Sequence, residues 1–476
     1  MQNLLSFEES LAWMQAHQDE MVADLQSFAR IRSVSRADLA EEGAPFGKEC
    51  RTMLDFALKR AGEMGFETQD HEGYCGSAIL GDGENAIGIC AHLDVVPEGD
   101  KWTFEPYGAT HRGDFLIGRG VGDNKSSAIL GLYVMKMLRE KGIPMKHGVR
   151  VLMGCSEETG MEDYAYYVKH YPVPVVSLVA DASYPVNYAQ KGSLRSDVVI
   201  DAGEQLAEFS GGEVFNMVAP HATALVRGVT VEQVKAAVAR QAEPERFTVE
   251  EENGCVRIRV RGKAAHAAFP EGGINALHLL ARMLEEGQLV SGQSLKAVHG
   301  IRELTDDIYG EKAGVACEDP DSGKSTVVCG LLCCEEGKLS LTVDGRLSVV
   351  AKPEEVAATY ERYAATLGFA SVDTSTTPPV FIALDDPKVV ALQALYKHVT
   401  GDDAQPYSMG GGTYSRVMPR SITYGPSFPQ GRGIRPDFIP AENGGGHAPD
   451  EFLYIPNWIR GAALYACAVL ELDALC

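Results

Sequence analysis

Short apolar segments that alternate with helical patterns constrain the fold of this 476-residue chain more than any other feature. Three apolar runs have the length of strands, at residues 85–91, 148–154 and 175–180. Between them, residues 126–141 and 161–171 have the spacing of amphipathic helices. Strands that alternate with helices form βαβ units, so the sequence predicts an α/β fold with a doubly wound, mainly parallel sheet.

The pattern changes after about residue 192. Clusters of β-branched residues then alternate with helical patterns, and some strands have the spacing of hairpins, which predicts an α+β domain with an antiparallel sheet. The polar segment 374–379 (TSTTPP) reads as a linker. We therefore predict a catalytic domain in two parts, residues 1–185 and 385–476, separated by an inserted α+β domain at residues 186–384.

The composition narrows the possible function classes. Forty-three Lys and Arg residues against 66 Asp and Glu residues give a formal net charge of −23, which argues against nucleic acid or an anionic membrane as the partner. The 11 cysteines form no CxxC pair, which favours a reducing cytosol over a disulfide framework. Neither a targeting segment nor an apolar run of membrane-spanning length is visible. We expect a cytoplasmic protein.

Potential metal ligands stand where the predicted strands end. They are His92, Asp94, Asp123, Glu157, Glu158 and Asp181. Asp123 follows a further predicted strand at residues 114–118. The carboxyl ends of parallel strands meet at one edge of the sheet, so we expect these side chains to share a crevice. His, Asp and Glu are the ligand types of a hydrolytic zinc centre.

Each of these residues taken alone also fits an ordinary structural role. A lone His is more often a surface or core residue than a ligand, a Glu pair usually faces solvent, and an Asp after a strand often caps a helix. The coincidence of ligand types at every strand end favours the metal site. The glycine-rich run at residues 118–126 is not a phosphate loop, because no Gly directly precedes Lys125 and Asp123 would repel phosphate.

Six motifs, in the same order along the chain, resemble the co-catalytic zinc aminopeptidase, carboxypeptidase and aminoacylase superfamily. They are His92-Leu-Asp94-Val-Val-Pro97, Gly120-Val-Gly-Asp123-Asn-Lys125, Ser156-Glu157-Glu158-Thr-Gly160, Asp181-Ala182, the segment from Gly262 through His266 to Ala276, and His447. The branch that looks most similar is dipeptidase V, the bacterial dipeptidases that resemble carnosinases, on the basis of segments such as Trp102–Gly108 and Gly211–Val218. The resemblance implies that the inserted domain is a lid.

The same resemblance implies a centre of two divalent metal ions, with zinc favoured and manganese or cobalt possible. Asp123 would bridge the two ions. His92 and Asp181 would bind one ion, and Glu158 and His447 would bind the other.

Three further residues acquire catalytic roles from the resemblance. Glu157 would be the general base, taking a proton from the metal-bridging water, because a carboxylate committed to a cation cannot also move that proton. Asp94 would hold the imidazole of His92 and fix its tautomer. His266, from the lid, would stabilise the oxyanion of the tetrahedral intermediate.

Substrate binding is also carried over from the resemblance. Arg346 would bind the C-terminal carboxylate of the substrate, with Asn216 assisting, because an Arg fork matches a carboxylate. Backbone N–H groups in the run that includes Gly411, Gly412 and Thr413 could assist. Without the resemblance, Arg346 would read as a surface charge and the glycine run as a plain turn.

Three functions are open at this point. The first is a two-metal dipeptidase that cleaves dipeptides with free termini. The second is an aminoacylase or carboxypeptidase-type amidohydrolase on the same centre, and the third is a non-catalytic metal-binding protein. A non-catalytic relative would have lost a metal ligand or the base. This chain has every one of those residues, which argues against the third function. The long insert favours the dipeptidase, and it favours a monomer, because a long lid supplies within one chain what a partner supplies in dimeric relatives.

Overall fold

The computed structural model describes residues 5–428 and 434–476. Contacts divide the chain into two compact units. Unit 1 comprises Met1–Tyr188, Ile382–Tyr407 and Thr413–Cys476, and unit 2 comprises Ala189–Phe381 and Ser408–Gly412. The segment Ser408–Gly412, which the sequence analysis placed in the second catalytic part, therefore groups with the inserted unit.

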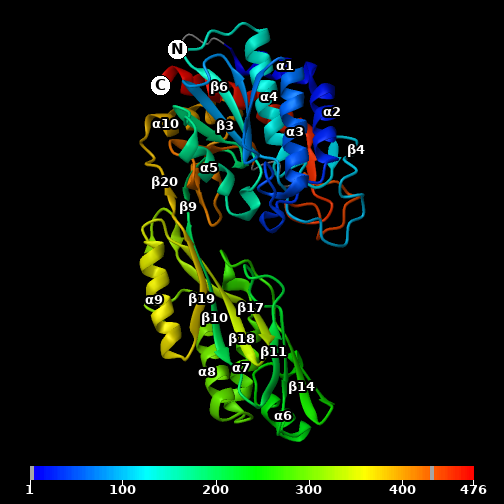
Figure 1. Ribbon diagram of the computed structural model, residues 1–476, viewed down its shortest axis with the longest axis vertical. Helices are drawn as coiled ribbons and strands as arrows, with labels where there is room; N and C mark the ends of the chain where they lie inside the picture. The colour runs from blue at the N-terminus through cyan, green and yellow to red at the C-terminus, as the bar shows by residue number, and fades with distance from the viewer. Residues whose placement is uncertain (1–4, 429–433) are drawn as a thin grey trace. The chain divides into compact units, whose positions relative to one another are not determined.

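Unit 1 is built from helices and a central sheet (Figure 1). The helices are α1 Phe7–Ala16, α2 Gln18–Ala29, α3 Gly47–Glu63, α4 Lys125–Glu140, α5 Glu162–His170, α10 Pro387–Thr400 and α11 Ile455–Leu475, with short 3-10 turns η1 Ala37–Leu39, η2 Glu157–Thr159 and η5 Tyr414–Arg416. The strands are β1 Glu67–His71, β2 Cys75–Leu80, β3 Ala86–His92, β4 Thr110–Arg112, β5 Phe115–Ile117, β6 Gly148–Gly154, β7 Val176–Val179, β8 Ala182–Ser183, β9 Val186–Gln190, β21 Tyr407–Met409, β22 Ser421–Tyr424, β23 Pro426–Ser427 and β24 Phe452–Tyr454.

The central sheet of unit 1 has the strand order β1-β2-β6-β3-β7-β22-β9. The four strands at its centre, β6, β3, β7 and β22, pair in parallel. The pairs β1–β2, β2–β6 and β22–β9 are antiparallel. The predicted α/β fold class is confirmed, with the parallel pairing confined to the centre. Every residue of β3 and β6 is buried, as expected for strands covered on both faces.

Both faces of this sheet are covered, because neighbouring residues of one strand point to opposite faces. Ile89 packs near Gly131 of α4. Its neighbour Cys90 lies in a separate apolar cluster with Tyr164 of α5 and with Tyr414. Helices on the two faces make the sheet doubly wound.

One predicted strand does not belong to the central sheet. The apolar run at residues 114–118 forms β5, which pairs antiparallel with β4 and β24 in a separate three-stranded sheet. The prediction that Asp123 follows a strand of the parallel sheet was therefore wrong. Asp123 lies instead just before α4, and its peptide bond to Asn124 is cis.

Unit 2 is an α+β unit. Its helices are α6 Val231–Val238, α7 Ala276–Glu286, α8 Gly292–Asp306 and α9 Pro353–Thr366, with turns η3 Pro244–Arg246 and η4 Pro270–Gly272. Its strands are β10 Gly192–Asp201, β11 Leu206–Gly211, β12 His221–Val226, β13 Phe247–Glu252, β14 Cys255–Arg261, β15 Glu318–Asp319, β16 Gly323–Lys324, β17 Thr326–Glu335, β18 Lys338–Leu347, β19 Ala370–Thr377 and β20 Val380–Phe381. The segment 374–379, interpreted as a linker, is mostly part of β19. Its Ser and Thr residues suit an edge strand as well as a loop.

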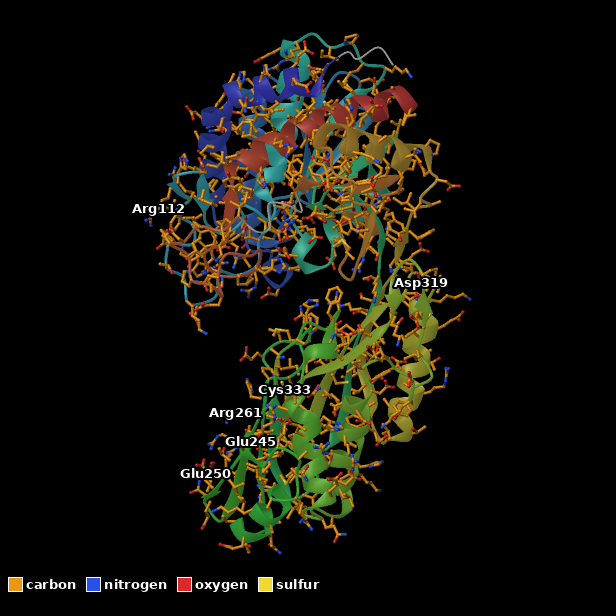
Figure 2. The ribbon with its side chains drawn as sticks, turned by 180° about the vertical axis from the view of Figure 1, so that it is seen from behind. Arg112, Glu245, Glu250, Arg261, Asp319 and Cys333 are labelled. Carbon is orange, nitrogen blue, oxygen red and sulfur yellow. The ribbon has the colours of Figure 1, made fainter. Side chains whose placement is uncertain are left out.

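The sheet of unit 2 has the order β13-β14-β12-β11-β17-β18-β10-β19, and all of its pairs are antiparallel. The residues of β14 alternate as expected for an antiparallel sheet with one buried face. Val256, Ile258 and Val260 enter the core, and the arginines between them point outward. Arg259 pairs with Glu250 of the neighbouring strand. Figure 2 labels Glu250 on this hairpin.

All 11 cysteines lie within the described residues, and each is a free thiol. Cys333, labelled in Figure 2, is exposed on β17. Among the described residues, the helices are too short or too polar to cross a membrane.

Candidate metal centre

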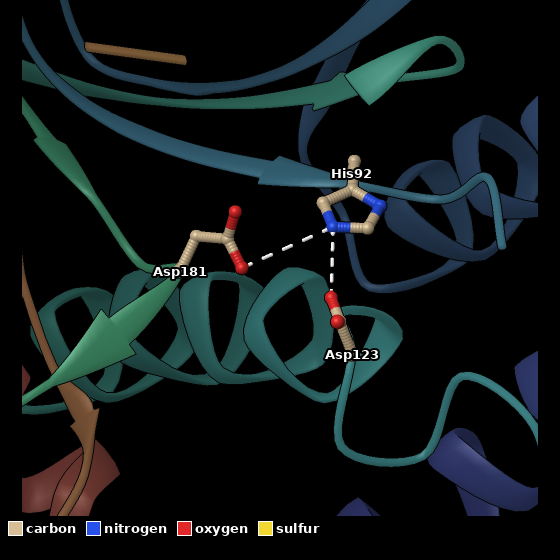
Figure 3. Close-up of side chains that lie close together, drawn as sticks. All are labelled: His92, Asp123 and Asp181. Atoms are coloured by element: carbon tan, nitrogen blue, oxygen red, sulfur yellow. Dashed lines mark hydrogen bonds and ion pairs between the residues drawn. The ribbon is translucent and has the colours of Figure 1, made fainter. Parts of the chain in front are cut away.

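The first ligand group consists of His92, Asp123 and Asp181 (Figure 3). His92 is the last residue of β3, and Asp181 follows β7, the parallel neighbour of β3. The Nε2 atom of His92 lies 3.1 Å from Oδ1 of Asp123 and 3.9 Å from Oδ1 of Asp181. The three side chains thus point toward one another, as metal ligands do.

The second group consists of Asp123, Glu158 and His447. Glu158 belongs to the turn after β6, and His447 comes from the loop before β24. The Nε2 atom of His447 lies 3.2 Å from Oδ2 of Asp123 and 2.9 Å from Oε1 of Glu158. Asp123 therefore offers one carboxylate oxygen to each group.

The donor atoms fit a pair of divalent cations. Ligand atoms about 2.0–2.1 Å from a tetrahedral zinc ion lie about 3.3 Å from each other. The distances from His92 and His447 to Asp123, 3.1 and 3.2 Å, have this size. Each group offers one imidazole nitrogen and two carboxylates, a donor set that suits zinc, manganese or cobalt.

The carboxylates make the centre favourable for positive charge. Hydrogen bonds to Asp123 and Glu158 raise the pKa of His447 to about 10. Burial opposes protonation of His92, but hydrogen bonds to Asp123 and Asp94 outweigh it and raise the pKa of this imidazole. Burial, together with the charge of Asp123, raises the pKa of Asp181 to about 8 although His92 opposes it. A cation bound here would relieve this concentration of negative charge.

Asp94 contacts both His92 and the turn that carries the two glutamates. The Nδ1–H of His92 donates to the backbone carbonyl of Asp94 at 2.9 Å, which leaves Nε2 as the ligand atom. The carboxylate of Asp94 lies slightly farther from Nδ1, at 3.5 Å. It also accepts hydrogen bonds from the backbone N–H groups of Glu157 and Glu158, at 3.2 and 3.0 Å. One buried carboxylate thus holds the turn beside the candidate base.

Glu157 lies next to Glu158 in this turn and belongs to neither ligand group. Burial, and then the negative charge of Asp181, raise the pKa of Glu157 well above its ordinary value. A carboxylate with a raised pKa is suited to general base and acid chemistry near neutral pH.

Three supporting residues were missed by the sequence analysis. The side-chain amide of Asn124 donates to Asp181 at 2.9 Å and to the carbonyl of Ala180, and its oxygen accepts from the backbone N–H of His92. Asp163 accepts the backbone N–H groups just before Glu157, and Glu451 accepts those around Asp123. Asn124 lies within the motif Gly120–Lys125, and Glu451 lies four residues after His447. Their roles, however, depend on partners that are distant in sequence. No local pattern reveals those partners.

His266 lies in unit 2, in a loop joined to the segment of Asn216. The backbone N–H of Ala267 donates to the carbonyl of Asn216 at 2.9 Å. The Nδ1 atom of His266 accepts from the N–H of Ala268 at 3.1 Å, so the neutral ring carries its proton on Nε2. Desolvation and then the charge of Arg346 lower the pKa of His266, which favours this neutral donor form.

Arg346 lies on β18 of unit 2, and its guanidinium forms a bidentate pair with Asp344 at 2.6 and 2.8 Å. Its cross-strand partner Thr326 donates through its hydroxyl to the carbonyl of Ala267. The sheet thus places Arg346 close to the loop of His266. Sequence reasoning did not identify Asp344 as the residue that orients the guanidinium.

The glycine run is divided between the units. Gly411 and Gly412 group with unit 2, where a Cβ on the adjacent Gly410 would lie 2.7 Å from the Cβ of Ala268. Thr413 groups with unit 1, is 1% exposed, and caps η5 by accepting from the N–H of Ser415. Its hydroxyl also contacts that of Thr423. These bonds account structurally for the side chain of Thr413.

Fold and ligand groups together define a class: hydrolases with an α/β domain that presents acidic residues and histidines at its strand ends, and with an inserted α+β unit. The comparison with protein families identifies the member of this class, because residues 88–471 match the peptidase family M20/M25/M40. The chain belongs to this family and is a peptide hydrolase. The family implies divalent metal cofactors.

Similar proteins agree with this assignment. The chain is 30% identical over 464 residues to a Bacillus subtilis protein named "Putative dipeptidase YtjP", covering 95% of this chain and 97% of the relative. Human carnosine dipeptidase 1 has the same fold, with a TM-score of 0.58 at 15% identity over 98% of this chain and 100% of that one. The dipeptidase Dug1p of Saccharomyces cerevisiae also has a TM-score of 0.58, at 12% identity over 98% and 99% of the two chains.

Proposed function

We propose that the protein is a dipeptidase that uses two divalent metal ions to cleave dipeptides with free termini. One observation carries this proposal: the two oxygens of Asp123 face two different histidines, each with a further carboxylate beside it. A bridging carboxylate between two ligand groups is the arrangement that holds two cations close together.

The residues of the chain supply the proton transfers and the charge stabilisation. Bound divalent cations would lower the pKa of a water molecule and polarise the scissile carbonyl. Glu157, which belongs to neither ligand group, takes the proton of the attacking water and passes it to the leaving amine. His266 donates from Nε2 to the developing oxyanion. Asp94 keeps the turn of Glu157 in place.

Substrate selection is assigned to residues of unit 2. The Arg346 guanidinium, held by Asp344, binds the C-terminal carboxylate of the substrate, and Asn216, Gly411 and Gly412 assist. Thr413 would contribute through its backbone, since its side chain already caps a turn. A carboxylate one residue beyond the scissile bond fixes the leaving group as a single amino acid.

The remaining assignments belong to this proposal as well. Zinc is the favoured ion, with manganese and cobalt as alternatives. The free thiols support a reducing, cytoplasmic location, and the net charge of −23 supports a partner other than nucleic acid or membrane. The protein would act as a monomer.

A substrate panel with metal analysis of the same preparation tests the proposal. Dipeptides should be hydrolysed, and dipeptide amides should fall by about 100-fold or more in kcat/KM because an amide lacks the carboxylate that would pair with the Arg346 guanidinium. Arg346→Ala should lose most of this preference. Because this variant also leaves the buried carboxylate of Asp344 without its cation, its activity is compared with the wild type at equal metal content.

The panel also decides between the alternatives. Efficient hydrolysis of tripeptides or dipeptide amides by the wild type would contradict dipeptide specificity. A preference for N-acyl amino acids would identify an aminoacylase or carboxypeptidase on the same centre. Metal content far below two ions per active chain would contradict the two-metal centre itself.

A further inference from the structure

A buried carboxylate that is not a metal ligand lies directly behind Asp123. Glu451 is 1% exposed, and its Oε1 accepts hydrogen bonds from the backbone N–H groups of Gly122 and Asp123 at 2.8 and 3.0 Å. Its other oxygen, Oε2, accepts from the N–H of Gly120 at 3.2 Å. A single side chain thus holds three N–H groups of the turn that presents Asp123.

The charge of Glu451 is compensated by Arg119, which is also 1% exposed. The Nη1 atom of Arg119 donates to Oε2 of Glu451 at 2.8 Å. The backbone carbonyl of Glu451 accepts from the N–H of Gly118 at 2.9 Å. A buried ion pair of this kind depends on both partners, since either charge alone would remain uncompensated.

Glu451 connects two segments that carry ligands of the same candidate ion. It lies four residues after His447 and is bonded to the turn of Asp123, and these two residues share the second ligand group with Glu158. The loop from His447 to Glu451 contains two non-glycine residues with left-handed backbone, His447 at φ 64° and Asp450 at φ 53°. Because such residues rarely adopt this conformation, the loop depends on its anchors.

We propose that Glu451, neutralised by Arg119, is a positioning residue that sets the affinity and geometry of the ion bound by Asp123, Glu158 and His447. The inference rests on the proposed two-metal centre. Both oxygens of Glu451 accept from donors, so Gln in its place would turn an NH2 group toward one set of N–H donors. Glu451→Gln keeps the shape of the side chain but loses bonds to the turn, so it should shift the turn of Asp123 relative to His447.

Asp473 provides a matched control. It is a buried carboxylate of α11, and it accepts the backbone N–H groups of Lys146 and His147 at 3.0 and 2.9 Å. Neither ligand group contains Asp473 or its partners. Asp473→Asn thus removes a comparable buried charge and comparable bonds without touching the turn of Asp123.

The experiment titrates metal-free wild type, Glu451→Gln and Asp473→Asn with Zn²⁺ against a chromophoric chelator, and records the visible spectrum of the Co²⁺ forms. Glu451→Gln should bind the ion of Asp123, Glu158 and His447 about 10-fold or more weakly and the other ion, which shares only Asp123, less weakly, with an altered cobalt spectrum. Asp473→Asn should match the wild type in both readouts, even if its thermal stability falls.

The outcomes separate this inference from the proposed function. A folded Glu451→Gln that binds both ions like the wild type would overturn the positioning role, as would an equal loss in Asp473→Asn. A wild type that binds fewer than two ions would instead overturn the two-metal centre. If Glu451→Gln does not fold, Arg119→Lys decides: it keeps a cation but loses the guanidinium that donates to both Glu451 and the carbonyl of Glu98. Normal affinity for both ions in this variant would contradict the inference.

Discussion

The two units hold their candidate functional residues by different means. In unit 1 the candidate ligands and base lie at the end of a strand or on loops, and buried carboxylates fix two of these loops by accepting backbone N–H groups. Asp94 holds the turn of Glu157 and Glu158, and Glu451 holds the turn of Asp123. In unit 2, Arg346 lies within a strand, and the loop of His266 is joined to its neighbours by main-chain bonds. Buried carboxylates hold the loops of unit 1. In unit 2, strand pairing and main-chain bonds place the residues, and the buried carboxylate of Asp344 only orients the Arg346 side chain.

This difference separates two kinds of defect. Loss of a loop carboxylate in unit 1 should disturb the cations, because the ligands depend on it. Loss of a side chain in unit 2 should leave the cations bound and reduce only turnover or substrate recognition. Metal content and activity measured on the same variants therefore test whether the units divide the work in this way.

The largest effect is expected within unit 1, at the adjacent glutamates. Glu157→Ala should lower kcat by about 10²–10⁴-fold, the range for a missing general base, and should retain about two metal ions per chain. Glu158→Ala should lose both activity and metal, since Glu158 faces His447 at 2.9 Å. Kinetics and metal analysis of the two purified variants make the measurement.

The neighbouring residues serve as each other's control, because both lie in the same turn beside Asp94. If both variants lost metal equally, Glu157 would be a ligand, and the separation between base and ligand would be wrong. If neither lost metal, the second ligand group would be wrong.

The same contrast explains how much of the fold could be predicted from the sequence. Apolar runs and helical spacing identify β3, β6, β7 and the helices between them. A strand buried on both faces is apolar along its whole length, and this is visible in the local sequence. The short strand β5 has the same local signature, yet it pairs outside the central sheet. Pairing depends on partners distant in the chain, which a single segment does not specify.

The candidate site shows the same limit. His92, Asp181 and the two glutamates could be placed together from their positions after strands, and the family motifs added His447. The roles of Asn124 and Glu451 could not be predicted, because each contacts residues many positions away. A family motif identifies the residues that bind an ion or the substrate more readily than the residues that position them.

A smaller effect is expected in unit 2, at His266. His266→Ala should lower kcat by about 10²–10³-fold, as for other missing oxyanion donors, and should keep full metal content. His266→Gln, which retains an N–H donor, should recover part of the loss. A fall in metal content in these variants would contradict the proposed division between the units.

Mixing experiments extend this prediction to the proposed monomer. His266→Ala is combined with an excess of Glu157→Ala, whose chain retains an intact His266. Activity should stay low if each chain supplies its own histidine. Recovery of activity on mixing would show that the histidine serves the centre of a partner chain, and the monomer proposal would then be wrong.

The smallest effect on activity, essentially none, is expected at a buried polar residue of unit 1 outside the metal centre. His71 on β1 is fully buried, with Nε2 at 2.6 Å from the hydroxyl of Ser77, and its ring meets those of Tyr167 and Tyr171 edge-on. Burial, and then the charge of Arg150, lower its pKa to about 4. The unfolded chain, with a His pKa of about 6.5, therefore binds this proton at a higher pH than the folded chain does.

Stability must accordingly fall as the pH drops from about 6.5 toward 4, because the unfolded state takes up the proton first. Between pH 7 and pH 4.5 this group should remove about 2–3 kcal/mol from the free energy of unfolding, and His71→Gln should lack that part of the loss. All three tryptophans, Trp13, Trp102 and Trp458, belong to unit 1, so tryptophan fluorescence in urea follows the unfolding of this unit. The same acid sensitivity in wild type and variant would assign it to other groups, while a change in kcat at pH 7 would show that buried polar residues of unit 1 affect the centre even without contacting its loops.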